Sequence, residues 1–182
     1  MRVGKISITI IFSMLFIAHQ NLNAQVDSSC ITAILQKQVT GTSMEGVVSQ
    51  GSMVYLYESF YKCNSVGRDD VVCYDYAGSK IPIIKMAKGL PGDTFSFPML
   101  DASLHCIMIN GDTLKEAGGN PYSLNASRYK LLALYENEFN GIIPKDTYLL
   151  LGSHSGTTDS GRFGFIGRGD LLGKIVYPKI KK

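Results

Sequence analysis

The feature that most constrains the fold is a series of short segments rich in β-branched and aromatic residues, separated by turns that contain glycine, asparagine or aspartate. Segments of this length and composition are typical of β-strands. Ile107–Ile109 runs into Asn110-Gly111, the dipeptide that most strongly indicates a hairpin turn. The sequence therefore predicts a mainly β fold of short strands. The other expected strands are Ser52–Phe60, Asp70–Tyr76, Lys80–Ala87, Asp146–Ser153 and Leu171–Pro178, with the segment DTLKE returning from the hairpin turn.

Helices are expected to be minor, because only two segments carry apolar residues at helical spacing. The first is Ser29–Val39, where Ser28 or Ser29 could cap the start. The second is the amphipathic segment Ser127–Asn137. We expect both to be helical.

The N-terminal region has the composition of an export signal. Two basic residues precede the apolar run Ile6–Ala18, and a polar stretch then ends at the small residue Ala24. A full bilayer span needs about 20 apolar residues, so the run is short for a permanent anchor. We expect residues 1–24 to be a signal peptide or, if retained, an N-terminal membrane anchor; a buried core helix is the remaining alternative. Residues 25–182 would then form a single domain outside the cytoplasm.

Size and charge narrow the class of protein. A chain of 182 residues with 45% hydrophobic and 18% charged residues can bury one core as an ordinary globular domain. The formal net charge of +3 is too small to indicate binding to nucleic acid, which normally depends on clustered positive charge.

The four cysteines, Cys30, Cys63, Cys73 and Cys106, show no spacing typical of a metal site. Cys63 and Cys73 lie on consecutive segments and could cross-link a hairpin, which would leave Cys30 to pair with Cys106. Four buried free thiols are the equal alternative, because disulfides depend on compartment and geometry.

Ser43, in the Gly-flanked loop GTSMEG, is a candidate nucleophile. By itself it is more simply a loop serine, because a serine needs a base to attack at neutral pH. One candidate base is His154, which lies in a polar loop and could form a triad with Ser43 and Asp159.

The other candidate base is Lys85, whose neighbours in Ile81–Ala87 are apolar or small. Burial would lower the pKa of the amine toward neutrality, as a general base requires. The alternative is that strand alternation directs Lys85 to solvent, where most lysines lie.

Several motifs together resemble the type I signal peptidase family, a group of Ser/Lys endopeptidases. They occur in the family's order and cover roughly residues 40–116 and 142–176. The string GLPGD after a lysine is the most specific of them. The motifs are GTSMEG with Ser43, QGSMVYL, RDDVVCY, IKMAKGLPGD, MINGDTLKE and GFIGRGDLLGKI. The resemblance implies a signal-peptidase-like β fold of short, mostly antiparallel strands with minor helices.

The resemblance also implies roles for single residues. Ser43 matches the nucleophile and Lys85 the general base, and Met44 would pack near the substrate cleft. The backbone N–H of Ser43 would donate to the oxyanion, and Thr42 could supply a second donor. Thr157 matches a hydroxyl residue that orients the lysine amine.

The late part of the motif is matched less completely. Gly152, Asp159 and Ser160 match structural positions of the family. Ser153 stands where an aspartate is usual, and Gly161 stands where an arginine is usual. Because the nearest arginine, Arg162, comes one place later than in the family, we expect the family's structural Asp–Arg ion pair to be shifted or lost.

Three further departures are Gly46, Asp69 and Met86, where proline, glycine and arginine are common in the family. Lys88 is a competing amine, but it lies three residues after Lys85 and hence on the opposite strand face. The departures suggest a divergent member, closer to the smaller conjugation-type (TraF-like) peptidases.

The resemblance implies a serine endopeptidase that cleaves exported precursor proteins after small residues, at the membrane surface, in the periplasm or on the outer face of the cytoplasmic membrane. It implies no metal and no organic cofactor. The alternatives are a catalytically inactive signal-peptidase-like binding module of the cell envelope, and a secreted structural β-domain in which Ser43 and Lys85 are incidental.

Overall fold

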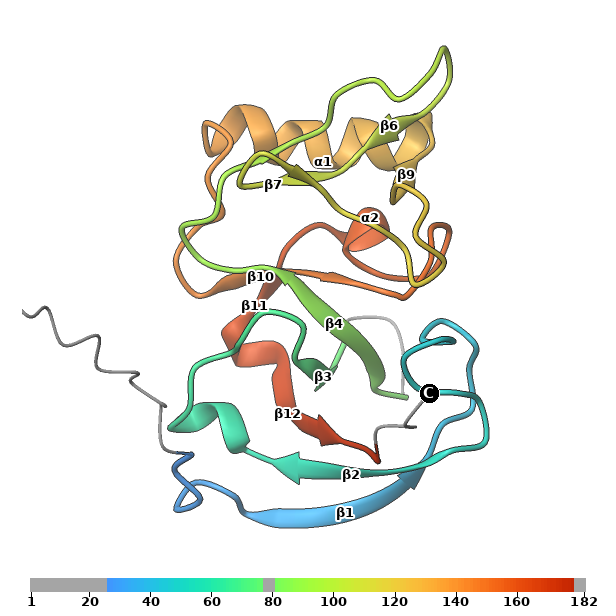
Figure 1. Cartoon of the computed structure of the whole chain (residues 1–182). Helices are drawn as coiled ribbons and strands as arrows, with labels where there is room; N and C mark the ends of the chain where they lie inside the picture. Colours follow the sequence, from blue (N-terminus) through green and yellow to red (C-terminus); the bar gives the residue numbers. More distant parts are fainter. Residues whose placement is uncertain (1–25, 77–80, 179–182) are drawn as a thin grey trace, which may run out of the picture.

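The computed structural model describes residues 26–76 and 81–178, and its main element is a seven-stranded antiparallel sheet (Figure 1). Neighbouring strands follow the order β1-β2-β12-β3-β4-β10-β11. The C-terminal strand β12 is thus inserted between β2 and β3. The strands are β1 (Ala33–Gln38), β2 (Met53–Glu58), β3 (Val71–Tyr74), β4 (Ile83–Gly89), β10 (Thr147–Leu151), β11 (Ile166–Gly167) and β12 (Leu171–Val176).

Two small sheets and the longest helix form a second layer above β10 (Figure 1). One sheet contains β5 (Phe95–Ser96), β7 (Met108–Ile109) and β8 (Asp112–Thr113), and the other contains β6 (His105–Cys106) and β9 (Ser123–Leu124). The predicted hairpin at Asn110-Gly111 joins β7 to β8, and both residues have the positive φ that such a turn requires. The helices are α1 (Ala126–Glu138) and α2 (Ser160–Phe163), with 3-10 turns at Phe60–Lys62 and Arg168–Asp170.

The core follows from the strand pattern. In β2 the side chains alternate, so that Val54 and Leu56 are buried while Met53 and Tyr55 are exposed. In β10 a continuous apolar run is buried on both faces. Leu149 belongs to the buried cluster of the second layer, and Leu150 belongs to a cluster with residues of β3 and β4. Strand β10 therefore joins the two parts of the core.

The mainly β fold with few, small helices is confirmed, and so is each expected strand, although Lys80 lies outside the described residues. The helix expected at Ser127–Asn137 is α1, which Asn125 caps by accepting a hydrogen bond from the backbone N–H of Arg128.

The helix expected at Ser29–Val39 is wrong, because this segment contains β1. It pairs with β2 from Ala33↔Glu58 to Gln38↔Met53. The helical spacing covered only a few apolar residues, whereas pairing along the whole of β2 satisfies the backbone groups on one edge of this six-residue strand. Tertiary pairing therefore overrides the local pattern.

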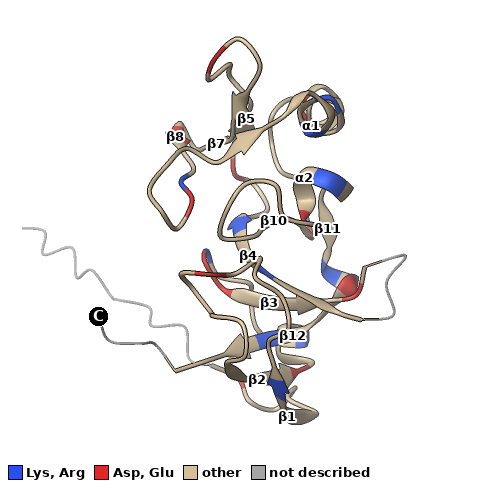
Figure 2. Cartoon of the chain, turned by 90° about the vertical axis from the view of Figure 1, so that its right-hand side faces the viewer, with Lys and Arg blue, Asp and Glu red and all other residues tan. Residues whose placement is uncertain are grey.

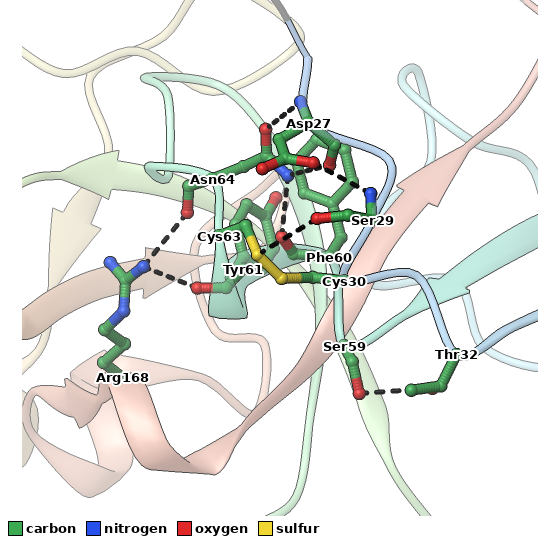
Figure 3. The surroundings of a disulfide bond; sticks show 10 residues. All are labelled: Asp27, Ser29, Cys30, Thr32, Ser59, Phe60, Tyr61, Cys63, Asn64 and Arg168. Carbon is green, nitrogen blue, oxygen red and sulfur yellow. Dashed lines mark hydrogen bonds between the residues drawn. A yellow bond between two sulfur atoms is a disulfide. The ribbon is translucent and has the colours of Figure 1, made fainter.

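Both expectations for the cysteines are also wrong. Cys30 forms a disulfide with Cys63, at a Cα–Cα distance of 5.8 Å (Figure 3). Cys73 and Cys106 are buried free thiols. Antiparallel pairing brings the start of β1 beside the end of β2, and Cys30 and Cys63 lie just outside these two ends. The pairing thus depends on strand register, which cysteine spacing does not reveal.

In the view of Figure 2, basic and acidic residues are interspersed over the elements and form no single basic face among the described residues. Within residues 26–76 and 81–178, no helix is both long and apolar enough to cross a bilayer. The expected leader, residues 1–24, lies outside the described residues.

Candidate active site

An apolar cleft of about 470 Å³ lies against the face of the main sheet that carries Val54, Leu56 and Ile175. Its sides are formed by the end of β1 with the following loop and by the first residues of β4. Ser43 and Lys85 both line this cleft. It is therefore a concave, mostly apolar site with a few polar groups, which is the usual form of a ligand or substrate site.

The loop after β1 holds Ser43 at the cleft. Met44 is buried and its carbonyl accepts the backbone N–H groups of Val47 and Val48, so the loop turns tightly behind the serine. The carbonyl of Ser43 accepts hydrogen bonds from the backbone N–H of Ser153, at 2.8 Å, and from its hydroxyl, at 3.3 Å. Ser153, the residue that replaces the usual aspartate, thus fixes the backbone of Ser43.

Lys85 lies on β4 opposite Val72 of β3, and only 2% of its surface is exposed. Its Nζ lies 2.7 Å from Ser43 Oγ and 2.8 Å from the carbonyl oxygen of Ile84. Burial lowers the pKa of the Lys85 amine from its ordinary value of 10.5 to about 8, although the Asp159 carboxylate acts in the opposite direction. Lys85 is therefore a poorly hydrated amine in hydrogen-bonding contact with a serine hydroxyl.

Asp159 is fully buried behind this pair and is surrounded by donors. Its Oδ2 accepts hydrogen bonds from the Tyr122 hydroxyl at 2.6 Å, the Gly152 N–H at 3.1 Å and the Thr157 hydroxyl. Its Oδ1 accepts the backbone N–H of Gly161 at 3.0 Å. Such a set of donors can stabilise an ionised carboxylate without solvent.

Two other predicted residues of this region have structural contacts. Gly152 leaves no room for a side chain, because a Cβ there would meet the Thr157 side chain and would lie 2.7 Å from the carbonyl oxygen of Ser43. The Ser160 hydroxyl accepts the backbone N–H of Leu150 and so ties the segment to β10. Both residues keep the chain close behind Ser43.

Other candidates lie differently from what the sequence suggested. The hydroxyl of Thr157 bonds to Asp159, while Lys85 bonds to Ser43 and Ile84. Thr42 is exposed and, among the described residues, is not part of the cleft lining. His154 is exposed and its Nδ1 contacts the neighbouring carbonyl of Ser155, so it does not bridge Ser43 and Asp159.

Lys88 forms an ion pair with Asp69 at 2.6 Å, away from Ser43. In the part of the chain that the structure describes, no three His, Cys, Asp or Glu side chains gather where they could hold a metal ion.

Sequence reasoning missed two residues that contact Asp159. Tyr122 donates to its Oδ2, and Arg128 of α1 forms an ion pair with its Oδ1 at 3.6 Å. The Asp–Arg ion pair is therefore shifted to a helix 31 positions earlier in the chain. No local pattern indicates this contact, since it depends on how α1 packs against the segment that contains Asp159.

The comparison with protein-family models agrees with the motifs. A sequence model of the family described as signal peptidase, peptidase S26, matches residues 8–179. A crystal structure of a signal peptidase I from Enterococcus faecalis V583 is similar to this chain, with 22% sequence identity and a TM-score of 0.46, covering 62% of this chain and 98% of that chain. A comparison with curated protein sequences found no match.

Proposed function

Because this chain belongs to the peptidase S26 family of signal peptidases, we propose that it is a serine endopeptidase that cleaves exported precursor proteins with a Ser43/Lys85 dyad. One observation carries the proposal: the buried Nζ of Lys85 lies 2.7 Å from Ser43 Oγ. A nucleophile within hydrogen-bond reach of a base is the arrangement that covalent catalysis requires.

In the proposed mechanism, neutral Lys85 accepts the proton of Ser43 as Oγ attacks the scissile carbonyl carbon. The backbone N–H of Ser43 donates to the oxyanion. The family resemblance offered Thr42 as a second donor, but Thr42 would have to turn toward the cleft to act as one, because it is exposed and outside the cleft lining. The tetrahedral intermediate collapses to an acyl-enzyme when the Lys85 ammonium returns the proton to the leaving amine. Lys85 then accepts a proton from the water that hydrolyses the ester.

The residues behind the dyad keep it in place. Ser153 holds the backbone of Ser43, and Gly152 and Ser160 hold the segment that carries Thr157 and Asp159. The Thr157 hydroxyl completes the donor set of Asp159, which is how we propose that it acts on the amine. Met44 is buried next to Ser43 and contributes to the lining of the cleft.

The substrate would lie extended in the cleft. Among the described residues, strand β1 pairs only with β2, so its other edge offers backbone groups to a peptide, as in recognition by strand addition. The family resemblance implies small residues at the first and third positions before the cleaved bond.

The proposed site of action is the cell envelope, with residues 1–24 as signal peptide or anchor and residues 25–182 as the peptidase domain. The Cys30–Cys63 disulfide supports an oxidising compartment. Ile34, Met53 and Tyr55 are exposed on the outer face of β1 and β2, which supports contact with the membrane surface.

The test is cleavage of a panel of exported precursors, with the cut site determined by mass measurement. Ser43→Ala and Lys85→Ala should each reduce cleavage by about 10³-fold or more while leaving the fold intact. His154→Ala should change it little. Equal cleavage by wild type and both dyad variants would refute the mechanism, and tight precursor binding without cleavage by the wild type would instead indicate an inactive binding module.

A further inference from the structure

The segment 122–128, which leads into α1, is fastened to the loop behind Lys85 by side-chain contacts. The Tyr122 hydroxyl donates to Asp159, and the backbone N–H of Ser123 donates to the hydroxyl of Ser155 at 2.7 Å. Arg128 donates from Nη2 to the carbonyl oxygen of Thr157 at 2.6 Å. The start of α1 therefore supports the same residues that surround Asp159.

Arg128 and Asp159 form an ion pair that is largely shielded from water. Their side chains are 12% and 0% exposed, and Nη1 lies 3.6 Å from Oδ1. Nη1 is buried and makes no hydrogen bond within the described residues, so its closest charged contact is this carboxylate. Removing one partner of a buried ion pair leaves an uncompensated charge, which is strongly unfavourable.

Gly161 leaves room for the Arg128 side chain to approach the Asp159 carboxylate. A Cβ at position 161 would lie 3.1 Å from Asp159 Oδ1 and 3.3 Å from Arg128 Nη1, which is tighter than ordinary contact. A residue without a side chain therefore stands where the arginine from α1 meets the carboxylate.

The charge on Asp159 acts on the amine of Lys85. It raises the pKa of that amine and so opposes the effect of burial. The other ionisable groups around Asp159 are the phenols of Tyr122 and Tyr74, and burial raises the pKa of each, so both are neutral. Arg128 is thus the cation that balances Asp159 among the described residues.

We propose that Arg128 is a positioning residue for the Ser43–Lys85 reaction, which holds Asp159 and Thr157 in place and balances the carboxylate charge behind the Lys85 amine. The inference rests on the proposed function, because only a working dyad gives the charge of this amine a consequence for catalysis. A purely structural role would affect stability but would not change the titration of Lys85.

The experiment uses the full chain and three variants. Arg128→Gln removes the charge but keeps a hydrogen-bond donor, whereas Arg128→Lys keeps the charge. Arg162→Gln is the matched control, because Arg162 is an exposed arginine close to Asp159 in sequence. Two quantities are measured: the pH dependence of kcat and KM, and the titration of the Lys85 amine by NMR in the absence of substrate.

We expect R128Q to move the Lys85 titration and the acidic limb of kcat to higher pH by about one unit, because an unbalanced carboxylate favours the ammonium. At pH 7.5 kcat should fall about tenfold, with little change in KM. R128K and R162Q should titrate like the wild type.

A folded R128Q protein with an unshifted Lys85 titration would overturn the inference, as would an R128K protein that shifts as far as R128Q. If R128Q does not fold, the neutral variants Arg128→Met and Arg128→Asn take its place, and the Lys85 titration must move to higher pH in each of them that folds. The proposed function fails separately, when Ser43→Ala cleaves as well as the wild type. An unshifted R128Q enzyme that requires Ser43 would contradict only the role of Arg128.

Discussion

At the scale of single residues, the proposed mechanism makes Lys85 the group that sets the pH dependence of cleavage. Its pKa lies at about 8 because the ammonium is poorly hydrated in its buried position. Below that pH the amine carries a proton and cannot accept one from Ser43. We expect kcat/KM to fall about tenfold per pH unit below pH 8 and to level off above it.

The measurement is kcat/KM on a peptide substrate from pH 6 to pH 10. The matched control is Lys88→Met, because Lys88 lies on the same strand but pairs with Asp69, so its removal should leave the profile unchanged. A profile that keeps rising to pH 10, as an ordinary lysine pKa of 10.5 would give, would contradict the lowered pKa of Lys85.

Ser43 and Lys85 could be predicted because each lies in a short motif that is visible without the fold. Arg128 and Tyr122 could not, since they reach Asp159 across 31 and 37 positions and their own neighbours contain no signal. The role of Ser153 was hidden for a different reason. Ser153 stands where the family usually has an aspartate, which suggested that a structural contact is lost. In the structure, the hydroxyl and the backbone N–H of Ser153 both donate to the carbonyl oxygen of Ser43.

At the scale of elements, β1 is an edge strand whose start is tied to the main sheet by the Cys30–Cys63 disulfide. The bond closes a loop with a sequence separation of 33, for which the chain-entropy model gives a stabilisation of about 3–4 kcal/mol. We expect Cys30→Ser/Cys63→Ser to lower the free energy of unfolding by about this amount, as measured in urea. Reductant should destabilise the wild type equally and leave the double variant unchanged. Wild-type unfolding that is insensitive to reductant would contradict the prediction.

The same strand shows where element prediction fails. The segment from Ser29 to Val39 has apolar residues at both helical and alternating spacing, and a short window does not separate the two. The pairing with β2 decides between them. In contrast, the segment Ser127–Asn137 was correctly predicted as a helix, and α1 extends slightly beyond it at both ends, from Ala126 to Glu138.

At the scale of the whole molecule, the C-terminal strand β12 completes the main sheet. β12 lies between β2 and β3, so residues near 175 complete the core behind the cleft. Strands β2, β3, β4, β10 and β12 could be predicted from local composition, but the strand order could not, because it depends on which apolar faces meet once the chain has collapsed. The cleft itself is therefore a property of the assembled sheet.

This assembly also predicts which part of the chain suffices for activity. The three buried clusters consist of residues between 31 and 177, and the start of the described chain is anchored where Asp27 and Asn64 exchange two hydrogen bonds. A chain of residues 26–182 should therefore unfold cooperatively and cleave a soluble peptide with the full chain's pH profile. A chain of residues 32–182 lacks both Asp27 and Cys30, so its urea midpoint should be lower. If the chain of residues 26–182 were already unfolded or inactive, residues 1–25 would have to contribute to the folded domain, and the assignment of residues 1–24 as a separate leader would be wrong.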